Sequence, residues 1–126
     1  KRAKLKMRTL LDSSFNDWNK VMKTPVLAEA QKLASVYGES VGYASDGDDQ
    51  YWAANNCNLA AKVLEKVKDW YGTAYWYKKG AAFGETGHAR AKIEGLRLDY
   101  WGAEAAKQGK LRFEFPPREA KVAKGN

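Results

Sequence analysis

The sequence holds little of the material from which most catalytic and metal sites are built. Among its 126 residues there is one cysteine, Cys57, and one histidine, His88. A single cysteine excludes an intrachain disulfide and any metal site built from several thiolates. No motif places a general base beside either residue, the carboxylates are scattered, and no glycine-rich phosphate loop is present. We therefore expect a protein that is not an enzyme and that holds no cofactor or metal ion.

Long apolar runs are also missing from the chain. The longest extend over a few residues, far short of the roughly 20 that a helix needs to span a bilayer. No part of the chain is therefore expected to cross a membrane unaided. The sequence starts at Lys1 and has no acidic residue before Asp12. A basic start of this kind is compatible with the remainder of an organellar targeting segment, but no apolar signal core follows it, so the localisation stays open between a soluble and a peripheral protein.

The acidic stretch that begins at Asp46 does not have the pattern of a calcium loop. An EF-hand loop starting there needs glycine at its sixth position and glutamate at its twelfth. Those positions hold Tyr51 and Cys57. The stretch instead predicts a solvated loop in which Asp48 or Asp49 caps the next helix.

Charge is plentiful and unevenly distributed along the sequence. The net charge is +7. Residues 1–23 carry seven basic and two acidic groups, whereas residues 24–58 carry one basic and five acidic groups. Such a basic segment favours an acidic partner surface, whether protein, nucleic acid or anionic lipid. Its first basic residues form a predicted docking arm without secondary structure: Lys1, Arg2, Lys4, Lys6 and Arg8.

Apolar residues at helical spacing predict two helices in the first third of the chain. The first covers residues 13–23 and ends before Pro25, because proline disfavours the helical conformation at the preceding residue. The second covers residues 24–37, with Pro25 at its first helical position. Gly38 is expected to terminate it in a left-handed conformation.

Two longer helices are predicted after a glycine-containing loop over residues 38–48. The first starts near residue 49 and is expected to continue past Gly72 as far as Phe83. The second covers residues 86–108. Its apolar residues repeat at alternating four- and three-residue spacing: Ala89, Ile93, Leu96, Tyr100 and Ala103. Such a repeat is typical of a helix that packs against a neighbour.

The resulting fold class is all-α, a small bundle of three or four helices. We divide the chain into a basic N-terminal arm (1–12), a helical bundle domain (13–110) and an extended C-terminal tail (111–126). In the tail, Phe113 and Phe115 alternate with charged residues before two prolines. This alternation predicts an extended segment with one apolar edge, which we expect to lie against a partner.

The most informative feature is a cluster of aromatic residues on one predicted helix. Its members are Trp70, Tyr71, Tyr75, Trp76 and Tyr77. At about 100° per residue they project around most of the helix, whereas one packing face spans little more than about 100°. We expect part of the cluster to be exposed, with Trp76 as the ring that anchors a partner; packing of all five within the domain is the open alternative. Lys78 and Lys79 complete the predicted partner-binding set.

Together these features predict a non-catalytic accessory, linker or stabilising subunit. It would dock on other protein subunits of a larger multiprotein complex through helix-face aromatics and its two terminal arms. A membrane-associated energy-transducing complex, respiratory or photosynthetic, would be one such assembly, reached peripherally through partners. The alternative is a small basic nucleic-acid-binding protein that uses Lys and Arg together with aromatic stacking.

Overall fold

The computed structural model describes residues 2–83 and Lys107. Its helices within that part of the chain are α1 (Arg2–Ser13), α2 (Phe15–Lys23), α3 (Leu27–Asp46), α4 (Gln50–Lys66) and α5 (Trp70–Ala81). The all-α bundle is confirmed, with five packed helices in the described region instead of the three or four predicted for the whole chain. The predicted helix over 86–108 and the tail, including Phe113 and Phe115, lie outside the described residues apart from Lys107.

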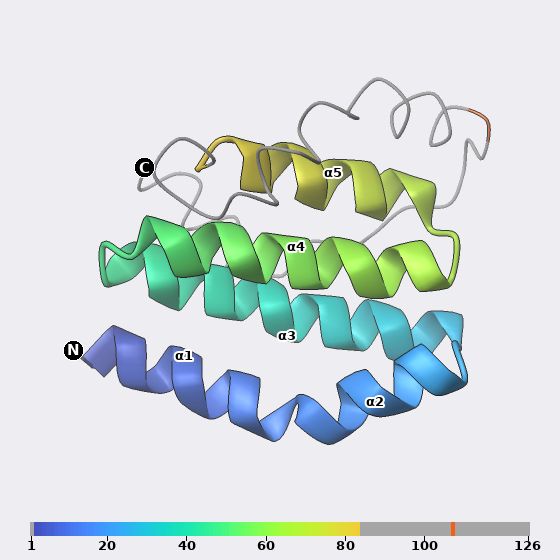
Figure 1. The fold of residues 1–126 in the computed structure, drawn as a ribbon, viewed down its shortest axis with the longest axis horizontal. Coiled ribbons are helices and arrows are strands. Elements are labelled where there is room, and N and C mark those ends of the chain that lie inside the picture. The colour runs from blue at the N-terminus through green and yellow to red at the C-terminus, as the bar shows by residue number, and fades with distance from the viewer. Residues whose placement is uncertain (1, 84–106, 108–126) are drawn as a thin grey trace.

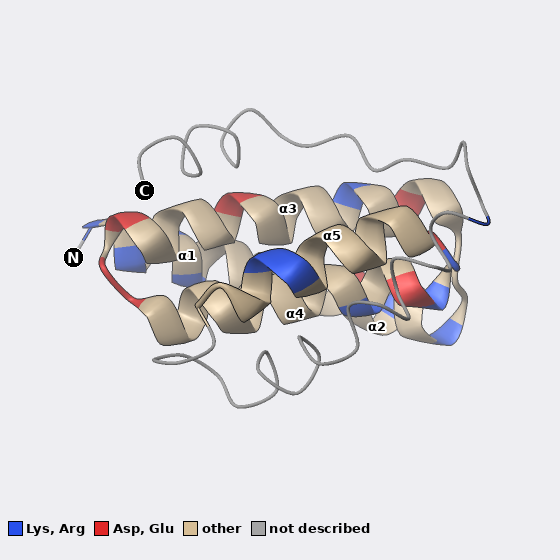
Figure 2. Ribbon diagram, turned by 90° about the horizontal axis from the view of Figure 1, so that it is seen from above, with Lys and Arg blue, Asp and Glu red and all other residues tan. Residues whose placement is uncertain are grey.

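The helices form three layers (Figure 1). α1 and α2 follow one another along one edge, α3 and α4 form the middle, and α5 covers the opposite side. The α3–α4 contact is the most extensive, α5 packs chiefly on α4, and α1 packs on α3. Seen from above, α5 runs lengthwise along the α3–α4 pair (Figure 2). One continuous core runs through all three layers, from Met7 in α1 to Trp76 in α5.

The basic start of the chain is part of the bundle and not an arm without secondary structure. Arg2–Ser13 form helix α1, and Met7 is only 1% exposed. Ala3, Leu10 and Leu11 are each partly buried and share the inward side with Met7, because helical residues three and four apart lie on one face. These residues form an apolar stripe at helical spacing among the charged ones, so the prediction that the segment has no secondary structure is wrong.

Helix α3 continues well beyond the predicted terminator. It runs from Leu27 to Asp46 and passes through Gly38 and Gly42, both buried. Glycine inside a helix costs about 1 kcal/mol relative to alanine, and close packing of α3 on α4 offsets that cost. The predicted start at Pro25 is also wrong, because α3 begins two residues later with Val26 at its N-cap position.

The α4–α5 junction corrects another prediction, a single helix that passes through Gly72. α4 ends at Lys66, and Lys68 adopts a left-handed φ of 61°. Asp69 then caps α5, accepting a hydrogen bond at 3.1 Å from the Gly72 backbone N–H. At the other end of α4, Asp49 accepts at 3.1 Å from the Trp52 backbone N–H, which confirms the predicted aspartate cap.

Candidate docking surfaces

The aromatic cluster of α5 is divided between the core and the surface. Trp76 and Tyr77 are 0% and 1% exposed. The Tyr77 hydroxyl donates to Glu65 Oε1 at 3.0 Å, and the Trp76 ring packs edge-to-face on Tyr75 with ring centroids 5.2 Å apart. The prediction that Trp76 is an exposed anchor is therefore wrong.

Two glycines explain why Trp76 points inward. Gly72, Trp76 and Gly80 are spaced four residues apart, so they share one face of α5, and all three are buried. At Gly80, an added Cβ would lie 3.1 Å from the Cβ of Cys57 in α4. At Gly80, this side of α5 therefore lies close to α4. This spacing is visible in the sequence and was the signal that would have placed Trp76 in the core.

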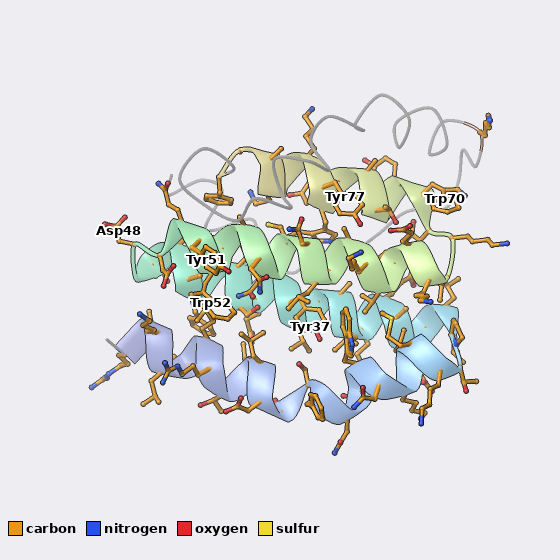
Figure 3. All side chains as sticks on the ribbon, in the orientation of Figure 1. Tyr37, Asp48, Tyr51, Trp52, Trp70 and Tyr77 are labelled. Carbon is orange, nitrogen blue, oxygen red and sulfur yellow. The ribbon has the colours of Figure 1, made fainter. Side chains whose placement is uncertain are left out.

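The remaining residues of the predicted set lie nearer to the surface. Tyr71 is 37% exposed, whereas Trp70 and Tyr75 are half-buried and pack against the core. Lys78 is exposed and Lys79 is half-buried. As expected from the directions in which the five aromatics project, one core face does not bury all of them. Figure 3 shows Trp70 and Tyr77 on α5. Trp70 lies at the opposite end of the bundle from Asp48.

A second aromatic pair lies in the first turn of α4, and sequence reasoning missed it. Tyr51 and Trp52 are 47% and 36% exposed, and their rings meet edge-to-face with centroids 5.7 Å apart. Both rings lie toward the end of the bundle that carries Asp48 (Figure 3). Beside the pair, Lys4 Nζ lies 3.7 Å from Asp49 Oδ2, which joins the start of α1 to the start of α4.

The basic residues of α1 project from a folded helix. Arg2, Lys4, Lys6 and Arg8 are exposed, and Lys1 lies outside the described residues. Lys4 is engaged by Asp49, and the Lys6 ammonium lies 5.6 Å from the centre of the Tyr43 ring. These contacts hold part of the basic charge against the bundle.

The outer side of α1 and α2 also carries two large apolar side chains. Leu5 and Phe15 are each 65% exposed, more than any other large apolar residue among those the structure describes. In α2, the Lys20 ammonium lies 3.5 Å from Glu29 of α3. Across residues 2–83 no ion pair involves Arg2, Arg8 or Lys23.

The described region lacks a cluster of side chains that could bind a metal ion. Cys57 is fully buried, and His88 lies outside the described residues. Within residues 2–83 and at Lys107 no group of three or more His, Cys, Asp or Glu side chains could hold a metal ion. The Asn58 amide is buried without a hydrogen-bond partner in that same region, as is Nδ2 of Asn56.

Comparison with other proteins gives this chain no assignment. No family model, no curated protein and no solved structure matches it. None of the helices in the described region is long and apolar enough to span a bilayer. What the chain does must therefore be inferred from its own surfaces.

Proposed function

We propose that this protein is a non-catalytic accessory subunit that docks on another protein of a larger assembly. The observation that carries the proposal is the exposed Tyr51–Trp52 pair at the start of α4. Tryptophan and tyrosine are frequent interface anchors, because each buries about 150–250 Å² on binding at little cost in side-chain entropy. The proposed role is the one predicted from the sequence, but the proposed anchor is this pair and not the buried Trp76.

The surroundings of the pair suit a protein partner. The neighbouring hollow is lined by Lys4, Gly47, Asp48, Asp49, Gln50 and Tyr51. It therefore mixes both charge signs around an aromatic centre, the composition of a polar rim around an apolar anchor. Asp48 and Asp49 also disfavour a nucleic-acid backbone, which would be repelled by carboxylates at this place.

The test compares partner capture by the wild-type chain and by Trp52→Ala. The protein is immobilised, the bound proteins from the native source are identified, and the affinity of the recovered partner is measured. Trp52→Ala should weaken binding by about 2 kcal/mol. The affinity is compared at a temperature where both proteins are folded, because the packed part of the Trp52 side chain contributes to stability. The cap at Asp49 is kept, since it uses only the Trp52 backbone N–H.

A matched control and a contrary outcome complete this experiment. Tyr71→Ala removes another partly exposed aromatic, on α5, and should leave the same affinity unchanged. Capture of nucleic acid that nuclease removes and that weakens steeply with salt would support the alternative nucleic-acid-binding function. Equal binding of the partner by wild type and Trp52→Ala would contradict the assignment of the anchor.

A further inference from the structure

We infer that the outer face of α1 and α2 binds an anionic lipid surface, a role separate from the protein docking proposed above. The face is defined by the basic residues Arg2, Arg8 and Lys23 and the apolar residues Leu5 and Phe15. It lies along the edge of the molecule opposite α5 (Figure 1).

The helical register brings basic and apolar groups to one side of α1. Arg2, Leu5 and Arg8 follow one another at three-residue spacing and are all exposed, whereas Met7 on the opposite side is buried. Residues three apart are neighbours on a helix surface. The Leu5 side chain is therefore flanked by two guanidinium groups that no carboxylate of the described region engages.

Helix α2 adds a second exposed apolar group to this edge of the molecule. α2 begins at Phe15, where the two helices meet at a bend that projects away from α3 and α4 (Figure 1). Leu5 and Phe15 are ten residues apart, roughly 15 Å along the helices. Two apolar groups thus project into solvent from one edge, with Lys23 at the end of the same helix pair.

The net charge of this edge points to an anionic partner. Residues 2–23 carry six basic and two acidic groups. Two of the basic groups, Lys4 and Lys20, are held by Asp49 and Glu29. The other four basic groups outnumber the exposed carboxylates of Asp12 and Asp17 on the same helices. One of the four, Lys6, lies over the Tyr43 ring.

The combination of leucine, phenylalanine and arginine favours lipid over the other anionic partners. At a bilayer surface, arginine and lysine meet lipid phosphates while leucine and phenylalanine enter the boundary between headgroups and acyl chains. A nucleic-acid backbone satisfies the arginines but has no place for a leucine side chain. The proposed surface therefore needs both the charges and the two apolar groups, and each requirement can be tested separately.

The experiment is flotation of the full chain with vesicles. One set contains phosphatidylcholine alone and the other contains about 30% phosphatidylserine to supply negative surface charge. Wild type should float with the phosphatidylserine vesicles and stay behind with phosphatidylcholine. Arg2→Gln with Arg8→Gln should weaken partitioning roughly fivefold for each charge removed. Leu5→Ala with Phe15→Ala should weaken it about tenfold or more.

Controls separate this surface from the rest of the molecule. Lys78→Gln removes an exposed charge on α5, at the opposite edge, and should leave partitioning unchanged. All variants should melt like wild type, because the altered side chains are exposed.

Three results would overturn the inference. The first is failure to bind phosphatidylserine vesicles, and the second is unchanged binding by the Leu5→Ala, Phe15→Ala variant. The third is tighter binding to duplex DNA than to the vesicles, lost in the arginine variant and kept in the apolar variant. The assay contains no protein partner, so its failure leaves the proposed docking through Trp52 untouched.

Discussion

Trp76 is the residue whose environment differs most from its expectation. It belongs to the same continuous core as Val63 and Leu64 of α4, on the side of α5 where Gly72 and Gly80 let the two helices approach. We expect Trp76→Ala to lower the free energy of unfolding by about 3–5 kcal/mol, the range for truncating a buried aromatic. Urea unfolding followed by circular dichroism measures it. Tyr71→Ala, on the same helix and partly exposed, should cost far less. A loss for Trp76→Ala as small as that for Tyr71→Ala would contradict the burial of Trp76.

Tyr37 predicts how stability responds to alkaline pH. Its side chain is 2% exposed, packs edge-to-face on Trp18 and lies 3.4 Å from the Ser14 hydroxyl. Burial raises the pKa of Tyr37 above its ordinary value of 10.0; the Ser14 hydrogen bond lowers it and the Asp17 carboxylate raises it further. The unfolded chain therefore loses this proton first. The contribution is fully present below pH 10 and is lost as the pH rises through the folded-state pKa.

The measurement compares wild type with Tyr37→Phe between neutral pH and pH 11. We expect the stability of wild type to fall more steeply above pH 10, by up to about 1.4 kcal/mol per pH unit for this one group. The phenylalanine variant keeps the ring but has no proton to lose. Parallel pH profiles for the two proteins would show that Tyr37 ionises equally in both states.

At the scale of the elements, the start of α5 depends on Asp69. Its carboxylate is fully buried, accepts from the Gly72 backbone N–H and lies 3.4 Å from the Gln31 amide nitrogen of α3. Asp69→Ala should cost about 1–2 kcal/mol, as the loss of a helix cap does. Asp69→Asn should retain most of the stability, because the amide oxygen still accepts. Equal losses from both changes would indicate that the negative charge matters more than the cap.

The closeness of α4 and α5 can be tested at Gly80. An alanine Cβ there would lie 3.1 Å from Cys57 Cβ and 3.6 Å from the Ala54 carbonyl oxygen. Gly80→Leu should therefore force the helices apart and cost about 1–3 kcal/mol, although leucine is the better helix former. Lys78→Leu, at an exposed position of the same helix, should not destabilise. A Gly80→Leu protein as stable as wild type would contradict the close approach.

The sequence predicted elements well where periodicity decides and poorly where tertiary contacts decide. The end of α2 at Lys23 and the aspartate cap of α4 are local features, and both are confirmed. Gly38 predicts a helix end because glycine favours a left-handed turn, but the residue is buried in the interior of α3, which continues to Asp46. The break at Lys68 was missed for the opposite reason, since lysine rarely adopts a positive φ and no glycine marks the turn.

The same limit applies to the candidate surfaces. The division of the α5 aromatics follows from helix geometry, and the spacing of Gly72, Trp76 and Gly80 marks the ring that turns inward. That α4 covers this side of α5 is a tertiary contact, which periodicity does not report. The exposure of Trp52 depends on where the bundle ends, which periodicity does not report. The charged residues of α1 conceal an apolar stripe of only a few residues, with Met7 as its buried member.

At the scale of the whole molecule, the shared core predicts that the described helices unfold together. Met7 of α1 and Val21 of α2 belong to the same core as Trp76 of α5. Met7→Ala should lower the unfolding free energy by about 2–5 kcal/mol. Tryptophan fluorescence and circular dichroism should still report one coincident transition. An early separate loss of helicity in this variant would mean that α1 and α2 are an independently melting layer.

The burial of Cys57 beneath Gly80 supplies a natural probe of motion. The thiol is the only one in the chain and is 0% exposed at the contact between α4 and α5. A thiol-specific reagent reaches it only when the protein opens, so the labelling rate divided by that of the unfolded chain gives the population of open molecules. If that population exceeds the globally unfolded fraction, α5 detaches while the rest stays folded. The labelling rate of Cys57 therefore measures how often α5 detaches, without any engineered label.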